Sequence, residues 1–304
     1  THIINNEIYD CACDVIQFGP NSSGGSVILY NDLFLTPGMY YDCMGNLDPN
    51  GSCACADYAI DLTGPGEAVR PFPLPEKEWV QIKRNVIWGY RPTDSSCGGT
   101  GSPGHSVTIG SGADNYVSYV LIRDNIIMDG VSGVQIGEAN VDHISIIGNL
   151  IYGMTKNLPD SYYGAITNLG GDAVEIYLNT IINADYWLRI GPDADQNDVI
   201  CNIAIDGNAR PFSSEMYDDV SVVDYNIFYN TVEYTTEGLQ NHDLVFGLAT
   251  DALNDEYCFN RRQWTDSEQV CIPYGLTTIE SPHQNACSPN IGQRIGIGVS
   301  DGIL

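Results

Sequence analysis

The sequence has little positive charge. Only 12 of its 304 residues are Lys or Arg, against 39 Asp or Glu, which gives a formal net charge of −27. A field of that sign repels nucleic acid and anionic lipid, so we expect neither as a partner. It also opposes an anionic polysaccharide, unless a local group of basic residues or bound Ca²⁺ reverses the sign. Acidity of this degree is equally typical of a soluble extracellular protein.

Long apolar runs are also missing. No segment reaches the ~20 consecutive apolar residues of a membrane-spanning helix, so we expect no membrane insertion. The chain shows no signal peptide and no initiator Met, and we expect it to be a processed, mature form. Hydrophobic residues still make up 43% of the chain and charged residues only 17%, a balance typical of a packed protein.

Paired zinc-binding motifs are absent, although cysteine is abundant. The histidines are scattered, and the two Cys-Ala-Cys segments lack the usual spacing of tetrahedral zinc sites. Disulfide bonds are therefore the preferred interpretation, which predicts a secreted protein, extracellular or at the cell surface. The spacing leaves their pairing open. The expected disulfide cysteines are Cys11, Cys13, Cys43, Cys53, Cys55, Cys97, Cys201, Cys258, Cys271 and Cys287.

A repeated pattern is the most informative feature of the sequence. Two apolar residues at alternate positions are followed by a short gap, an asparagine and further apolar residues. Clear copies occupy residues 80–87, 120–127, 144–151 and 174–181, and looser copies surround Asn6, Asn31, Asn202 and Asn226. The closest copies are 23 to 25 residues apart. Strands this short bury a face only by stacking on neighbouring repeats, so the period predicts a solenoid.

A second short strand is expected after most copies. Apolar residues flank one outward polar position each time, which is the period-two pattern of a strand. The outward residues are Gln17, Asp61, Thr108, Gln135 and Arg189.

The repeated asparagine has a physical explanation in such a fold. Its side chain can lie inside a bend and bond the asparagine of the coil above and below. Asparagine also tolerates the left-handed backbone conformation that such bends need. We therefore predict an all-β, right-handed parallel β-helix with loop insertions. Over residues 2–230 the pattern resembles the pectate-lyase-like β-helix superfamily, which includes polysaccharide lyases, glycoside hydrolases and pectin esterases.

The expected domain organisation is a single unit. Residues 1–230 form the β-helix, with cysteine-containing insertions near 34–58 and 92–104 that leave at the same point of their coils. These insertions should lie side by side. Residues 231–304 form an irregular C-terminal cap, with a short helix at 242–253. Because residue 1 already lies within a coil, exposed strand edges predict end-to-end stacking into a homopolymer.

Two basic residues are the candidate catalytic groups. Lys83 and Arg123 lie two residues before successive asparagines, so both should point outward on neighbouring coils. The resembling lyases neutralise a uronate carboxylate with such groups, use Lys or Arg as the base, and often bind Ca²⁺. The alternative is an ordinary solvated pair balanced by Asp124 or Glu175.

Other candidate residues belong to binding. Asp61, Gln135, Tyr177 and Arg189 are expected to contact substrate, and a carboxylate pair of Asp57 and Asp61 is the hydrolase alternative. Trp88, Trp187, Tyr90 and Tyr177 either stack on sugars or pack in the protein.

A short acidic segment is the candidate metal site. Asp193, Asp195 and Asn197 alternate as Ca²⁺ ligands do, although the segment is not an EF-hand and an Asp-rich turn is the alternative.

The predicted function follows from the fold. We expect a secreted carbohydrate-active protein with a polysaccharide or cell-surface glycan as its partner. The most concrete version is a polysaccharide lyase acting on uronate polymers. The alternative is an extracellular structural protein or filament subunit without catalysis. A glycan-binding adhesin is the third possibility.

Overall fold

A computed structural model describes most of the first three quarters of the chain. The described residues are 1–19, 25–42, 44, 46–51, 53–54, 56–63, 75–92, 104–110, 116–137, 140–155, 163–205, 220–224, 226–229, 244–246, 253–260 and 269–276. They are almost entirely β-structure with two short 3₁₀ turns, η1 (Pro37–Met39) and η2 (Glu76–Glu78). Within these residues no helix has the length and apolar character needed to cross a membrane.

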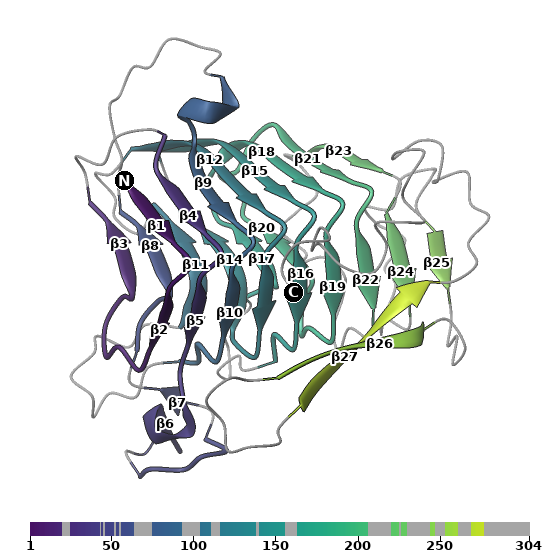
Figure 1. Cartoon of the computed structure of the whole chain (residues 1–304). Helices are drawn as coiled ribbons and strands as arrows, with labels where there is room; N and C mark the ends of the chain where they lie inside the picture. Colours follow the sequence, from purple (N-terminus) through teal and green to yellow (C-terminus); the bar gives the residue numbers. More distant parts are fainter. Residues whose placement is uncertain are drawn as a thin grey trace.

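Three parallel sheets make up the body of the protein (Figure 1). Sheet A contains β1 (His2–Ile4), β4 (Val27–Leu29), β9 (Val80–Lys83), β12 (Val117–Arg123), β15 (Val141–Ile147), β18 (Asp172–Tyr177), β21 (Asn197–Ile200) and β23 (Val220–Asp224). Sheet B contains β2 (Glu7–Tyr9), β5 (Asp32–Phe34), β10 (Val86–Trp88), β13 (Ile126–Met128), β16 (Leu150–Tyr152), β19 (Thr180–Ile182), β22 (Ile203–Ile205), β24 (Ile227–Tyr229) and β25 (Leu244–Phe246). Sheet C contains β3 (Ile16–Phe18), β8 (Ile60–Leu62), β11 (His105–Ile109), β14 (Ser132–Ile136), β17 (Ile166–Asn168) and β20 (Leu188–Ile190).

The chain passes through these sheets in a fixed order. Apart from one inserted hairpin, successive strands from β1 to β20 belong to sheets A, B and C in turn. Each strand pairs in parallel with its counterpart in the next circuit, and we call one such circuit a rung. The prediction of an all-β protein with stacked parallel strands is confirmed, and the arrangement is compatible with a β-helix.

The interior is a stack of aliphatic side chains. In sheet A one inward column is fully buried over six rungs, and its members are Ile28, Ile82, Ile122, Ile146, Ile176 and Val199. Burying each such side chain contributes about 1.5–3 kcal/mol. Each rung places its apolar side chains against those of its neighbours, so the alternating sequence pattern sets which residues face outward.

Asparagines form a continuous ladder at the turn between sheets A and B. The backbone N–H and the side-chain Nδ2 of Asn125 both donate to Oδ1 of Asn149 at 3.0 Å, and Nδ2 also donates to the carbonyl of Ile82 at 2.9 Å. The same asparagine-to-asparagine bonds link Asn6, Asn31, Asn85, Asn125, Asn149, Asn179, Asn202 and Asn226. The predicted bonding between asparagines of neighbouring rungs is confirmed.

The left-handed residue of this turn is not the asparagine. The residue directly before it has positive φ in seven rungs, namely Asn5, Tyr30, Arg84, Asp124, Gly148, Leu178 and Cys201. The expectation that the asparagine itself adopts this conformation was wrong. Its contribution is the side-chain amide, while the neighbouring residue bends the backbone.

The two predicted insertions begin side by side. They follow β5 and β10, which are paired neighbours in sheet B. The first insertion contains the antiparallel strands β6 (Tyr40–Tyr41) and β7 (Cys53–Ala54). Ala54 N donates to the carbonyl of Pro92 at 2.7 Å, where the second insertion starts. Residues 93–103 of that insertion lie outside the described residues.

After residue 230 the structure describes three strands, at residues 244–246, 253–260 and 269–276. β25 adds a further parallel strand to sheet B, so at residues 244–246 the structure has a strand where we expected a helix. β26 (Leu253–Asn260) and β27 (Gln269–Leu276) then form an antiparallel hairpin in which Cys258 lies opposite Cys271.

Candidate functional site

Lys83 and Arg123 occupy the same position on neighbouring strands. They end β9 and β12 and are direct partners in the parallel register of sheet A. The outward column to which they belong runs through Leu29, Lys83, Arg123, Ile147 and Tyr177, as predicted. Adjacent strands of a sheet are ~4.8 Å apart, so the two side chains leave the sheet next to each other.

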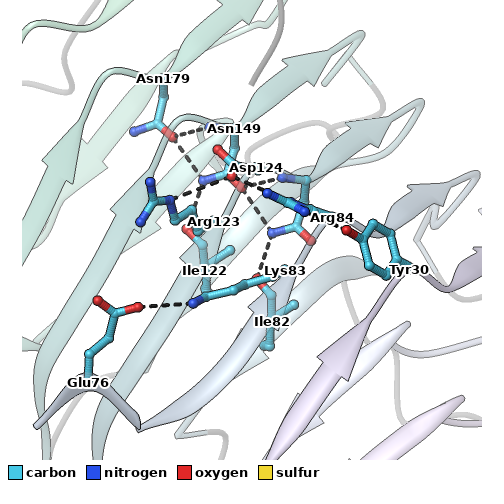
Figure 2. Close-up of polar contacts among 11 residues, drawn as sticks. Tyr30, Glu76, Ile82, Lys83, Arg84, Ile122, Arg123, Asp124, Asn149 and Asn179 are labelled. Atoms are coloured by element: carbon cyan, nitrogen blue, oxygen red, sulfur yellow. Dashed lines mark hydrogen bonds and ion pairs between the residues drawn. The ribbon is translucent and has the colours of Figure 1, made fainter. Parts of the chain in front are cut away.

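Each of these cations has a carboxylate neighbour. Lys83 Nζ lies 3.0 Å from Oε1 of Glu76, which belongs to η2 (Figure 2). Arg123 Nε lies 3.6 Å from Oδ2 of Asp124, the next residue in the chain. Ion pairs this exposed contribute about 0–1 kcal/mol, so they orient the side chains more than they stabilise the fold.

A third cation completes the group. Arg84 Nε lies 3.9 Å from the same Asp124 oxygen, and its guanidinium donates to the hydroxyl of Tyr30 (Figure 2). Arg84 and Asp124 both precede ladder asparagines and have positive φ. We call Lys83, Arg84 and Arg123 the basic cluster. Its three positive charges face two carboxylates, which leaves one positive charge in excess.

The alternative of a pair balanced by acidic neighbours is correct in part. Asp124 is one of the expected neighbours, but Glu175 instead accepts a hydrogen bond from Ser145 Oγ at 2.8 Å. Sequence reasoning missed Glu76, because that residue comes from the segment before β9 and not from the repeat. It also missed Arg84, since the period-two pattern assigns no outward position to a turn residue.

Tyr177 lies at the other end of this column. Burial, followed by the nearby charges of Asp198 and Glu175, raises the pKa of its hydroxyl to about 12. The hydroxyl donates to Oδ2 of Asp198 at 3.4 Å. Tyr177 is therefore a neutral hydrogen-bonding group on the same face as the basic cluster.

The second predicted column lies on sheet C. Its register runs through Gln17, Asp61, Thr108, Gln135, Thr167 and Arg189, so the expected members are aligned and Thr167 is added. Asp61, Gln135 and Arg189 are thus on a different sheet from the basic cluster. Of the four predicted substrate residues, only Tyr177 therefore shares a face with the predicted catalytic pair.

Carboxyl groups gather near the start of sheet C. Asp61 is almost completely buried and accepts from Gln17 Nε2 at 3.3 Å. Burial raises the pKa of Asp57, and burial together with the charge of Asp57 raises the pKa of Asp14, to which Asp61 is hydrogen-bonded. The hydrolase alternative therefore gains a third carboxyl group, but Asp61 itself is inaccessible to a polymer.

The candidate calcium residues do not share a surface. Asp193 and Asp195 are exposed, whereas Asn197 is fully buried and its Oδ1 accepts from Asn168 Nδ2 at 2.9 Å. Across the described part of the chain, no group of three or more His, Cys, Asp or Glu side chains is arranged to hold a metal ion. Asn197 contributes to the interior, and this segment offers only its two aspartates to solvent.

Three of the four candidate aromatic residues are packed in the protein. Trp88, Tyr90 and Trp187 are buried, and Trp88 stacks on Phe34 with ring centroids 4.5 Å apart. These three residues are unavailable for stacking on sugars. Of the four, only Tyr177 is partly exposed.

The cysteines fall into three groups. Cys11 and Cys13 are free thiols, which corrects the expectation that both are in disulfides. Cys53 and Cys201 are disulfide-bonded. For Cys258 and Cys271 the structure gives the backbone register alone. The remaining expected disulfide cysteines, Cys43, Cys55, Cys97 and Cys287, lie outside the described residues.

Comparison of the chain with models of protein families, with curated proteins and with solved structures finds no match. The superfamily resemblance of the repeat therefore depends on the residues of this chain alone.

Proposed function

We propose that the protein is a secreted, right-handed parallel β-helix that binds an acidic polysaccharide through the basic cluster. The order of the strands through sheets A, B and C supports the β-helix, and right-handed crossovers are strongly favoured between parallel strands. Anionic sugars are the proposed ligand because the cluster carries excess positive charge on an outward face. Partial exposure leaves its cations accessible, with side-chain exposures of 21% for Lys83, 33% for Arg84 and 36% for Arg123.

The observation that carries this proposal is the register of Lys83 with Arg123. The two side chains leave the sheet from backbone positions ~5 Å apart, and a polymer carboxylate placed between them would be attracted by both cations. In a protein of net charge −27, a local excess of positive charge is unusual. Arginine adds planar, bidentate recognition of a carboxylate, which Lys83 lacks.

Cleavage by β-elimination is the catalytic version of the proposal. A base removes the proton next to the uronate carboxylate, the adjacent carbon–oxygen bond breaks, a double bond forms, and the leaving oxygen takes up a proton. Arg123 would hold the carboxylate and Lys83 would act as the base. Lys83 is held by Glu76 in this structure, so catalysis also requires that this ion pair opens. Binding makes no such demand and is the function that the geometry supports best.

The test combines a binding and a cleavage assay. Wild-type protein is incubated with polygalacturonate and alginate, with and without Ca²⁺, while the ultraviolet absorbance of unsaturated products and the binding isotherm are recorded. We expect binding that weakens about tenfold in Lys83→Ala and in Arg123→Ala, because each variant removes a charge-assisted hydrogen bond. Arg189→Ala is the matched control, since it removes an arginine from sheet C.

The two assays together distinguish a lyase from a glycan-binding protein without catalysis. An absorbance signal lost in Lys83→Ala would establish a lyase at the basic cluster, whereas binding without absorbance would establish a glycan-binding protein. If neither polymer binds, or if Arg189→Ala weakens binding as much as Arg123→Ala, the proposal is wrong. A structural or filament role would then be preferred, with electron microscopy of the purified protein as the next measurement.

A further inference from the structure

A backbone irregularity recurs on the outer face of sheet A. Tyr119, His143 and Ala173 have positive φ values of 60°, 52° and 51°, although each lies within or at the start of a strand. In β12 and β15 the residues on either side are paired, and Tyr119 and His143 themselves are skipped. The register is the same on both sides of these positions, so no residue is inserted. A left-handed residue instead interrupts the pairing at the same place in each strand, and non-glycine residues in this conformation cluster at functional sites.

The left-handed residues Tyr119 and His143 belong to a column of rings. Tyr119 and His143 stack with centroids 4.8 Å apart and planes 21° apart, which matches the spacing between rungs. Trp79, which directly precedes β9, meets Tyr119 edge-on at 5.5 Å. The column therefore begins at Trp79 and continues over two rungs along the solenoid.

The next position of the column holds only a methyl group. Ala173 follows His143 in the register, since Asp142 pairs with Asp172 and Ile144 with Val174. Ala173 is partly exposed, and its N–H donates to the carbonyl of Asp195 at 3.0 Å, which aligns it with Gln196 on the following rung. A six-membered ring placed over Ala173 would continue the stack at the same spacing.

Carboxylates surround this position. Asp142 accepts from the hydroxyl of Tyr116 at 2.7 Å, and Asp172 is exposed and accepts from the N–H of Asp195 at 3.1 Å. Carboxylates accept hydrogen bonds from hydroxyl groups but repel other carboxylates. The surroundings therefore favour an uncharged ring with hydroxyl groups and disfavour a uronate.

We propose that the position over Ala173 is a subsite for an uncharged sugar ring, which continues the Trp79, Tyr119 and His143 column. The inference extends the proposed function, because the basic cluster lies on the same face. Ala173 lies four residues before the end of β18, about 13 Å along the strand, and β12 lies two strands from β18, about 10 Å across the sheet. One polysaccharide chain of a few units can reach both places. The preferred ligand class is thus a polysaccharide that alternates an uncharged sugar with a uronate.

The experiment compares two polymers at equal uronate concentration. Oligosaccharides of hyaluronan alternate glucuronate with an uncharged N-acetyl sugar, whereas polygalacturonate contains uronate alone. We expect hyaluronan to bind up to about tenfold more tightly, since aromatic stacking contributes about 0.5–1.5 kcal/mol. Calorimetric titration of the intact protein measures both affinities.

Filling the position tests the inference directly. Ala173→Phe should remove the preference for hyaluronan, because its ring occupies the position that the uncharged sugar would take, so that both polymers then bind with similar affinity. Arg123→Ala should weaken the binding of both polymers. Thermal denaturation identifies a misfolded Phe variant, and Asp172→Ala then serves as the second probe, because it removes a hydroxyl acceptor from an exposed site.

The two proposals fail in different ways. If Arg123→Ala weakens binding but folded Ala173→Phe and Asp172→Ala retain the preference for hyaluronan, the subsite is wrong and the basic cluster remains. Equal affinity of the wild-type protein for both polymers also overturns the subsite alone. Absence of binding to either polymer overturns both proposals.

Discussion

At the scale of single residues, the ladder asparagines have the most demanding role. Each fully buried member accepts two hydrogen bonds from one neighbour, donates two to the next and donates a further one to a carbonyl. Removing one side chain leaves donors of the preceding rung without an acceptor in a dry interior. Such unsatisfied groups cost about 1–3 kcal/mol each.

Asn125→Ala is therefore expected to destabilise the protein by roughly 3 kcal/mol or more. The substitution leaves the N–H and Nδ2 of Asn85 without their acceptor and the carbonyl of Ile82 without its donor. Urea denaturation followed by circular dichroism measures the effect. Asn6→Ala is the matched control, because Asn6 is exposed and its loss should cost much less. Equal costs at the two positions would contradict the role assigned to buried ladder bonds.

His105 is a buried titratable residue that no predicted function uses. It lies in the buried interior between the sheets, stacked on Tyr58 at 5.8 Å and edge-on to Tyr163 at 4.7 Å. Neither ring nitrogen has a hydrogen-bond partner among the described residues. Burial lowers the pKa of the imidazole from 6.5 to about 3, so the residue is neutral in the folded protein.

This shift has a defined consequence for stability. Between pH 6.5 and about 3 the unfolded chain binds a proton at His105 that the folded protein does not. Acidification through this range therefore destabilises the fold, by roughly 3–5 kcal/mol at its acid end. His105→Phe keeps the ring stack and should remove this component of the pH dependence. Thermal denaturation across the range tests it, and an unchanged profile in the variant would show that His105 is not buried in neutral form.

Of the two features of the turn between sheets A and B, the sequence predicted the hydrogen bonds between asparagines but not which residue adopts the left-handed conformation. The asparagine bonds followed from a fixed position in each repeat. The left-handed residue did not, because Tyr30, Arg84 and Leu178 have nothing in common in sequence apart from preceding an asparagine. Their conformation is imposed by the strands on both sides of the turn.

At the scale of strands, alternation between apolar and polar residues predicted both outward columns. It missed β17, because the inward residue at its end is Asn168 and not an apolar side chain. Asn168 is satisfied internally by Gly171 and Asn197, which no pattern of hydrophobicity indicates. The left-handed conformation of Tyr119 and His143 was missed for a similar reason, since nothing in the alternating pattern of a strand marks a residue with positive φ.

Short apolar segments without a repeat were the least predictable elements. Residues 244–246 were expected to be helical, because a brief apolar run fits a helix and a strand equally well. Pairing with β24 decides between them, and that pairing is a tertiary contact. Glu76 was missed in the same way, since only the path of the chain before β9 brings it to Lys83.

The β26–β27 hairpin predicts one disulfide pairing. Cys258 and Cys271 face each other directly in the antiparallel register, where Cα atoms lie ~4.5–5.5 Å apart, within the range of a disulfide. Closing this hairpin should stabilise it by about 3 kcal/mol. Trypsin cuts between the two cysteines at Arg261 and Arg262. We expect mass spectrometry of a non-reduced digest to find the flanking peptides joined, and joined no longer in Cys258→Ser.

Cys201 and Cys287 occur in the same two tryptic peptides, so a bond between them would also join the fragments. The Cys258→Ser digest distinguishes the two cases. Peptides that remain joined in that variant, or free Cys258 in the native protein, would contradict the pairing.

At the scale of the whole molecule, the net charge opposes the ligand that the basic cluster favours. The −27 charge acts over a distance set by the Debye length, about 30 Å at 0.01 M salt and about 10 Å at 0.1 M. The basic cluster acts only over the few ångströms that separate it from a bound carboxylate. Low salt therefore extends the repulsion more than the attraction.

Affinity for polygalacturonate should therefore rise as the salt concentration increases from about 0.01 to 0.1 M, because the long-range repulsion is screened first. Cationic binding proteins lose affinity over the same range. Calorimetric titration at several NaCl concentrations measures the trend, with uncharged dextran as the control polymer. A steady loss of affinity would indicate that a larger basic surface, and not the three-residue cluster, binds the polymer.

The ladder also makes the rung a unit of length. Residues 126–149 contain one strand of each sheet, β13, β14 and β15, and end on an asparagine equivalent to Asn125. Excising them would join Asn125 to Leu150 and restore the same sequence of turn, strand and ladder one step shorter. An excision longer or shorter by a single residue would instead turn polar columns inward. The stack of strands can therefore become longer or shorter in evolution only by whole turns, whereas loops outside the strands can vary freely.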